Sequence, residues 1–199
     1  MKNLRRWEIA ALLALCIALC TGTWAQKRQA ALASSLVRLH VLAVSDSDEE
    51  QAVKLKVRDA VLAYLDGRLE GISDPTQARQ VLAGELEGIA RAAESAAEGR
   101  GVSVTLTRES YPVREYEGFT LPAGVYDSLR VILGEGRGHN WWCVVFPPLC
   151  TGEAESADIL AAMGEDNYAL ITGAEGYVFR FRILELWGEA MRALGVGYR

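Results

Sequence analysis

The hydrophobic pattern changes its period along the chain, and these changes predict the secondary structure. Residues 36–44 are almost continuously apolar and rich in β-branched residues, which is typical of a buried strand. From residue 48 to residue 69 the apolar positions recur at helical spacing, and Gly71 is expected to end this helix. A second helix is predicted from Pro75 to about Ala97, with two internal glycines that either weaken it or allow close packing on a neighbour.

From residue 102 onward the period becomes two, which predicts strands with one buried face. The expected strands cover residues 102–107, 113–120, 125–133 and 140–146. The last of them is expected to pair back against residues 129–133, so that the strands form an antiparallel β-meander.

The remainder of the chain predicts helices. Apolar spacing indicates helices at 153–163 and 177–194, separated by a loop-like stretch at 164–176. The order of elements is strand, helix, helix, then the meander and the C-terminal helices. This order indicates an α+β fold.

The N-terminus begins with basic residues and continues with a long uncharged stretch. Three basic residues among the first six precede a run from Ile9 to Gln26 that carries no charge. The run fits a secretory signal peptide, and at about 18 residues it also reaches the lower limit for a membrane helix. If it is not cleaved, residues 7–26 would anchor the protein. The predicted organisation is a signal peptide or signal anchor (1–26), a linker (27–35) and a single exported α+β domain (36–199).

The charge of the exported part argues against one class of partner. Residues 1–26 hold three of the 21 basic residues and one of the 26 acidic ones, so the rest of the chain carries a net charge of −7. Binding to nucleic acid requires a basic surface that neutralises phosphates. No nucleic-acid partner is therefore predicted.

Residues 138–150 combine a paired tryptophan, an apolar run and a double proline. Such a stretch either fills the core or presents a rigid surface to a partner. On a strand, Trp141 and Trp142 face opposite sides, so one can be core while the other meets solvent or a partner. Exposed aromatic side chains beside rigid prolines are typical of interface anchors. The candidate contact residues here are His139, Asn140, Trp141, Trp142, Pro147 and Pro148.

Two basic residues occupy unusual positions on the first helix. Lys54 and Arg58 project from within its apolar arc and lie one turn apart, where like charges repel each other. An acidic group is therefore expected opposite them. Either they form an internal ion pair, with Asp46 or Asp48 as acid, or their apolar stems are buried while the charged ends reach water, or they bind a partner.

Cys143 and Cys150 are the two cysteines of the exported part. In an oxidising compartment a disulfide between them is expected, and closing an eight-residue loop would contribute roughly 2–3 kcal/mol. The alternative is a pair of buried free thiols whose side chains point apart.

Residues that could carry chemistry are few. The chain has only two histidines, and neither they nor the cysteines show the spacing of a metal site. No nucleophile elbow or phosphate-binding loop is present, so no catalytic residue, metal or cofactor is predicted. The alternative is a small exported hydrolase that uses His40, Asp46 and His139, which requires the two histidines to converge. A further alternative is a structural envelope protein in which both tryptophans are core.

Two motifs resemble the stage II sporulation protein R family of endospore-forming bacteria. The first is LHVLAVSDSD at 39–48, which continues into QAVKLKVRDAV at 51–61. The second runs from LPAG at 121–124 to GHNWWCVVFPPLC at 138–150. Val44 departs from the family pattern, which has Asn before Ser45-Asp46. The departure affects what is expected of a local turn here, and not the resemblance itself.

The resemblance implies a signal and not a catalyst. Proteins of this family are made in the forespore and exported across its inner membrane into the space between forespore and mother cell. There they trigger a membrane-embedded aspartic protease in the mother-cell membrane, which processes the precursor of the early mother-cell sigma factor. The implied partners are this protease and, through an uncleaved N-terminal segment, the inner membrane.

Overall fold

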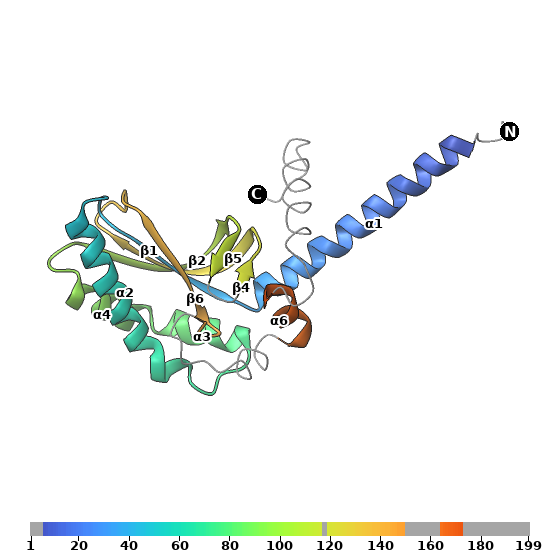
Figure 1. Ribbon diagram of the computed structural model, residues 1–199. Coiled ribbons are helices and arrows are strands. Elements are labelled where there is room, and N and C mark those ends of the chain that lie inside the picture. Colours follow the sequence, from blue (N-terminus) through green and yellow to red (C-terminus); the bar gives the residue numbers. More distant parts are fainter. Residues whose placement is uncertain (1–5, 117–118, 150–163, 173–199) are drawn as a thin grey trace.

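The computed structural model describes residues 6–116, 119–149 and 164–172 (Figure 1). It contains both helices and sheets, which confirms the α+β class. The elements in chain order are α1 (Arg6–Ser34), β1 (Val37–Leu42), α2 (Asp48–Leu69), α3 (Pro75–Gly84), α4 (Leu86–Ala96), β2 (Val102–Tyr111), β3 (Arg114–Tyr116), β4 (Phe119–Leu121), β5 (Gly124–Leu133), β6 (Asn140–Phe146) and α6 (Glu165–Thr172).

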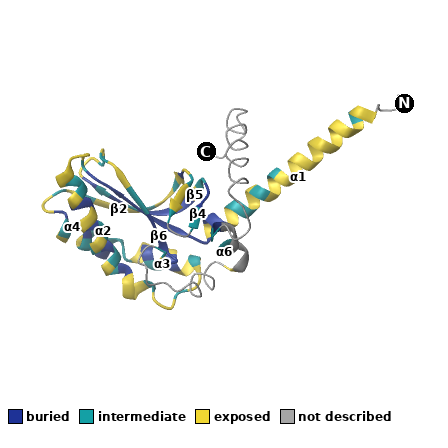
Figure 2. Ribbon diagram, viewed as in Figure 1, coloured by how far each residue is buried: buried dark blue, intermediate teal, exposed yellow. Residues whose placement is uncertain are grey.

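The main sheet has four strands in the order β2-β5-β1-β6. Helices α2, α3 and α4 cover one face, where their apolar residues pack against alternate positions of β1, β5 and β2 (Figure 2). We call the opposite side of the sheet the far face. There a second cluster joins Leu32 of α1, and Leu36 just after this helix, to Tyr111, Tyr126 and Val144 of the sheet region.

The strand pairing differs from the predicted meander. β1 lies between β5, to which it is parallel, and β6, to which it is antiparallel. The expected pairing of 140–146 with 129–133 is therefore wrong, because β1 occupies the place beside β5. All six residues of β1 are buried. Such a strand is most stable in the middle of a sheet, where both edges find hydrogen-bond partners and both faces are covered.

Two further predictions differ from the structure in detail. The strand expected at 113–120 is instead a hairpin of β3 and β4, which forms a separate two-stranded sheet. Residues 165–172 form α6 where a loop was expected. The helices predicted at 153–163 and 177–194 lie outside the described residues.

The helical part of the prediction is closer to the structure. α2 begins and ends where the pattern predicts, with Ser47 as N-cap. The helix expected from Pro75 to about Ala97 is broken at Glu85, so that α3 and α4 are separate helices. Tyr64 of α2 lies directly against Gly88, where a Cβ atom would be 1.8 Å from its hydroxyl. Close packing at this glycine is therefore confirmed.

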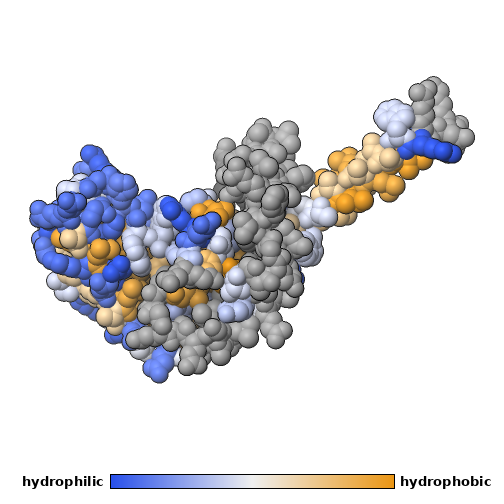
Figure 3. Space-filling view, in the orientation of Figure 1, coloured by the Kyte–Doolittle hydropathy of each residue, from blue (hydrophilic) through white to orange (hydrophobic). Residues whose placement is uncertain are grey.

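The first helix continues through the segment predicted as a linker. α1 is helical as far as Ser34, and Leu32 and Ala33 are buried against the domain. Residues 27–34 thus belong to one continuous helix and are not an irregular spacer. The apolar stretch of α1 projects from the body (Figure 3) and is long and apolar enough to cross a membrane, a property that signal sequences share. The division into a signal segment and an exported domain stays a prediction.

Candidate functional site

The two tryptophans of β6 lie on opposite faces of the sheet, as the alternation predicts. Trp141 pairs with Val41 and faces α2, whereas Trp142 pairs with His40 and faces the far side. Both side chains are half-buried. Neither tryptophan is therefore only a core residue, which counts against a purely structural role for this stretch.

On the helix side, residues from three segments meet at the start of β6. We call this group the helix-side corner; it consists of Asp46, Lys54, Arg58, His139 and Trp141. The Arg58 guanidinium lies 4.9 Å from the centre of the Trp141 ring. Lys54 Nζ donates to the His139 carbonyl at 3.1 Å. His139 Nδ1 lies 2.6 Å from Asp46 Oδ1. The structure thus brings together four of the predicted contact residues: Lys54, Arg58, His139 and Trp141.

Lys54 is the buried centre of this corner. It retains 5% of its accessible surface, and within the described ranges no carboxylate lies within 4.0 Å of its ammonium. Burial lowers the pKa of Lys54 and the nearby Arg58 lowers it further, while Asp46 raises it. The predicted internal ion pair with Asp46 or Asp48 does not form as a direct contact, because Asp46 binds His139. Lys54 instead fixes the loop that carries His139.

On the far face, His40 holds a network of hydrogen bonds. Its Nδ1 donates to Glu109 at 2.9 Å, because a carboxylate can only accept, and its Nε2 lies 2.9 Å from Asn140 Oδ1. Ser128 donates to the same carboxylate at 3.0 Å. Burial alone would raise the pKa of Glu109, but the hydrogen bond and charge of His40, with Ser128 and Arg130, outweigh it and lower that pKa.

Trp142 lies in an aromatic group beside this network. Its ring centre is 5.6 Å from that of His40 and 6.1 Å from that of Tyr111. The Arg114 guanidinium covers it at 3.7 Å. The sequence alone did not indicate Arg114, Glu109 or Tyr111. Glu109 and Tyr111 lie beyond the strand expected at 102–107, which extends to Tyr111 in the structure, and Arg114 was only one polar position of the strand expected at 113–120.

The remaining predicted residues lie at the other end of β6. Pro147 is buried, so only Pro148 of the pair offers surface. Cys143 is fully buried in the core between the sheet and the helices. Cys150 lies outside the described residues, and the disulfide stays a prediction.

The hydrolase alternative requires three residues that the fold separates. Asp46 and His139 meet at the helix-side corner, but His40 faces the far side, where both of its ring nitrogens are engaged. His40 and His139 therefore do not converge. In the part of the chain that the structure describes, no three potential metal ligands cluster either.

Comparison with known proteins gives one consistent result. The family described as Stage II sporulation protein R matches residues 33–156. The Stage II sporulation protein R of Bacillus subtilis (strain 168) is 35% identical over 134 residues, which is 65% of this chain and 60% of that protein. The chain thus matches about 60% of the length of this relative. No solved structure matches.

Proposed function

Because the chain belongs to the stage II sporulation protein R family, we propose that it is an exported signal of sporulation that activates a membrane-embedded aspartic protease. In this proposal the protease lies in the mother-cell membrane. Once activated, it processes the precursor of the early mother-cell sigma factor. The exported protein contributes a binding surface, and the protease contributes the catalytic groups.

The N-terminal segment supports export. α1 is exposed along its apolar stretch and follows a basic start, which is the pattern of a signal peptide or signal anchor. We place the domain in the space between forespore and mother cell, with residues 7–26 either removed or holding it to the forespore membrane. In the uncut form, the continuous helix of α1 would keep the domain close to that membrane.

The observation that carries the proposal is the helix-side corner. Tryptophan and arginine are the residues most enriched among the energetic centres of protein interfaces. Here the Arg58 guanidinium, which also binds Asp59, lies 4.9 Å from the centre of the Trp141 ring. Both side chains are partly exposed, and the His139 side chain beside them is 76% exposed. Lys54 holds the backbone of His139 in place. A surface ordered in this way loses little conformational entropy when a partner binds.

Co-expression in a non-sporulating host tests this function. The full chain is expressed with the candidate protease and the sigma-factor precursor, and precursor cleavage is followed on immunoblots. We expect cleavage to require the chain. Arg58→Ala removes the guanidinium beside Trp141, and the loss of a typical energetic centre, about 2 kcal/mol, corresponds to roughly 30-fold weaker association. Arg91→Ala is the matched control, because Arg91 is exposed on α4.

The possible results of this experiment distinguish an error in the proposed function from an error in the proposed binding surface. Cleavage in the absence of the chain would refute the proposed function. If cleavage requires the chain but is unchanged in Arg58→Ala, Trp141→Ala and Trp142→Ala, the proposed function stands. The proposed binding surface is then wrong. Accumulation of each variant outside the cytoplasm is measured in parallel, so that a defect in export is not mistaken for a defect in binding.

The paired cysteines belong to the same proposal. A domain exported to an oxidising space would join Cys143 to Cys150 by a disulfide. The resulting ring would enclose the Pro147-Pro148 turn at the end of β6 and hold it in one conformation.

A further inference from the structure

Arg38 of β1 is a cation enclosed within the protein. Its side chain is fully buried on the far face. Tyrosine rings surround the guanidinium, whose central carbon lies 3.9 Å from the centre of the Tyr111 ring and 5.0 Å from that of Tyr126. A third ring, Tyr116, lies at 5.9 Å. Cation–π attraction offsets part of the cost of taking this charge out of water, but ring faces do not replace acceptors in the plane of the guanidinium.

Most of the hydrogen-bonding capacity of Arg38 is unused. Its Nη2 donates to the Tyr116 hydroxyl at 2.6 Å, whereas Nε and Nη1 have no partner among the described residues. Arg130 also has an unpaired Nε, but a carboxylate oxygen of Glu109 lies 3.9 Å from it. No such carboxylate accompanies Arg38 within 4.0 Å in the described ranges. A buried charge without a counter-charge is among the most costly arrangements in a folded protein.

A second unpaired donor lies in the same region. Trp142 Nε1 is buried, and no acceptor for it is present in the described part of the chain. Trp142 is two positions from Val144, which is opposite Arg38 in the β1–β6 pairing, so both side chains lie on one face of adjacent strands. The Tyr111 ring contacts both, at 3.9 Å from the Arg38 guanidinium carbon and 6.1 Å from the Trp142 ring centre.

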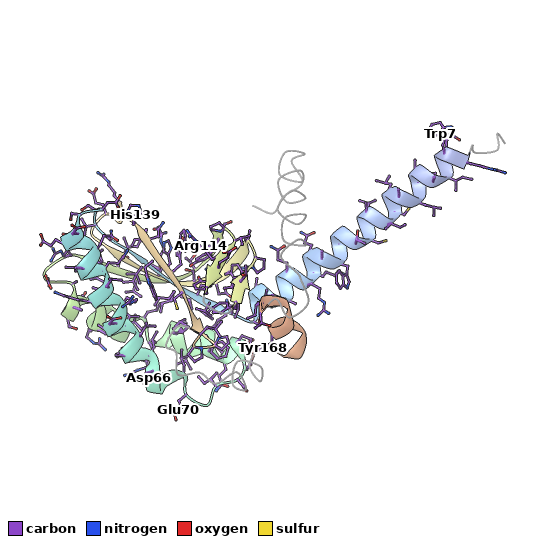
Figure 4. The ribbon with its side chains drawn as sticks, viewed as in Figure 1. Trp7, Asp66, Glu70, Arg114, His139 and Tyr168 are labelled. Atoms are coloured by element: carbon purple, nitrogen blue, oxygen red, sulfur yellow. The ribbon has the colours of Figure 1, made fainter. Side chains whose placement is uncertain are left out.

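The β3–β4 hairpin covers this region. It supplies the Tyr116 hydroxyl to Arg38 and places Arg114 over the Trp142 ring, and Figure 4 shows Arg114 beside the sheet. The hairpin forms a sheet of its own with three residue pairs. By itself a pairing this short is only marginally stable, and the buried side chain of Leu121 together with the stacking of Tyr116 on Phe119 holds it on the body. An acceptor that reaches the guanidinium therefore has to replace the Tyr116 hydroxyl at Nη2.

We propose that Arg38 and Trp142 Nε1 form a binding site for a carboxylate group, which replaces the Tyr116 hydroxyl as a partner of the guanidinium. The guanidinium offers parallel N–H donors that match the two oxygens of a carboxylate. One buried cation among aromatic rings balances a single negative charge, whereas a phosphate dianion would require more. The site rests on contacts within this chain and does not depend on the proposed signalling function.

Sodium acetate is the probe for this site. It is titrated into the full chain in a non-ionic detergent, with sodium chloride at equal ionic strength as reference. The five tryptophans give five indole N–H signals after 15N-indole labelling, and Trp142→Phe identifies the signal of interest. We expect acetate, and not chloride, to move that signal downfield to saturation. If the Trp142 signal responds equally to both salts, the proposal is wrong.

Substitution of Arg38 separates a binding role from a structural one. In Arg38→Met we expect acetate affinity to fall by about 10-fold or more, since a charge-assisted hydrogen bond is lost. Arg38→Lys keeps the charge without the planar fork, should bind acetate about 10-fold more weakly, and serves if the methionine variant does not fold. Arg91→Met removes an exposed charge on α4 and should bind acetate as wild type does. Unchanged affinity in either Arg38 variant would overturn the proposal.

A second ligand distinguishes a carboxylate on a protein side chain from one on a small free molecule. A blocked glutamate, N-acetylglutamate with its α-carboxyl amidated, presents a protein side chain. If it binds more tightly than acetate, the site receives a glutamate or aspartate of a protein. If acetate binds as tightly or more tightly, the site receives a small free carboxylate. Binding of neither ligand would refute the site.

Discussion

The carboxylate of Glu109 joins the hydrogen bonds of the far face, and its substitution gives a prediction that can be worked from the structure. It accepts from His40 Nδ1 at 2.9 Å and from Ser128 Oγ at 3.0 Å, and Arg130 lies 3.9 Å away. In Glu109→Gln the charge is lost and one of the two acceptor atoms becomes a donor. His40 Nδ1 contacts both carboxylate oxygens, at 2.9 and 3.1 Å, so in the variant it faces a group that cannot accept at one of the two positions. A hydrogen bond to a charged group contributes about 1.5–3 kcal/mol.

The expected loss is smaller than that figure because the side chain of Glu109 remains 23% exposed. We therefore expect Glu109→Gln to lower the free energy of unfolding by about 1–2 kcal/mol at pH 7. Urea titration of the full chain in detergent, followed by tryptophan fluorescence, measures this difference. Glu94→Gln is the control, since Glu94 is exposed on α4 and its substitution should leave the free energy of unfolding unchanged.

The pH dependence gives this prediction its sharpest test. The pKa of Glu109 is lower in the folded protein than in the unfolded chain, where it is about 4.3. Its contribution to stability is thus complete above about pH 4.3 and is lost as the pH falls through the lower, folded value. The difference between wild type and Glu109→Gln should therefore shrink below about pH 4. A difference that stays constant down to about pH 2 would refute the role given to the ionised carboxylate.

The remaining predictions concern packing and the disulfide. Gly88→Ala places a Cβ atom 1.8 Å from the Tyr64 hydroxyl, and overpacking should outweigh the gain in helix propensity and lower the free energy of unfolding by about 1 kcal/mol. Gly84→Ala meets open space and should not destabilise, so equal effects in urea titrations would contradict this reasoning. Cys143 and Cys150 of the exported protein should resist alkylation until a reductant is added, with the mass of the denatured, non-reduced chain about 2 Da lower; free alkylation of both would exclude the bridge.

The candidate site was predictable in part from the sequence. The helical periodicity of α2 singled out Lys54 and Arg58 as charges inside an apolar arc, and strand alternation placed Trp141 and Trp142 on opposite faces. Both inferences depend only on local geometry, 100° per residue in a helix and 180° in a strand. The meeting of Arg58 with Trp141 was not predictable, because it depends on how α2 packs on β6.

The far face shows the limit of local patterns more clearly. Arg38 and His40 appear in the sequence as two polar residues in an apolar strand. Their partners, Tyr116 and Glu109, lie 78 and 69 positions away. No spacing rule connects residues so distant in the chain, and the contacts exist only because β1 lies in the middle of the sheet.

By itself, the sequence determined the class of the fold, the bounds of α2, the presence of a buried strand at 36–44 and the family. These properties follow from periodicity, capping and motif, which neighbouring residues carry without help from the rest of the chain. Only the tertiary structure decided the strand order, the continuity of α1 through residues 27–34, and the enclosure of Arg38 by three tyrosines. Strand order and side-chain enclosure depend on burying apolar surface across the whole domain, and many arrangements of the same local elements satisfy the same local pattern.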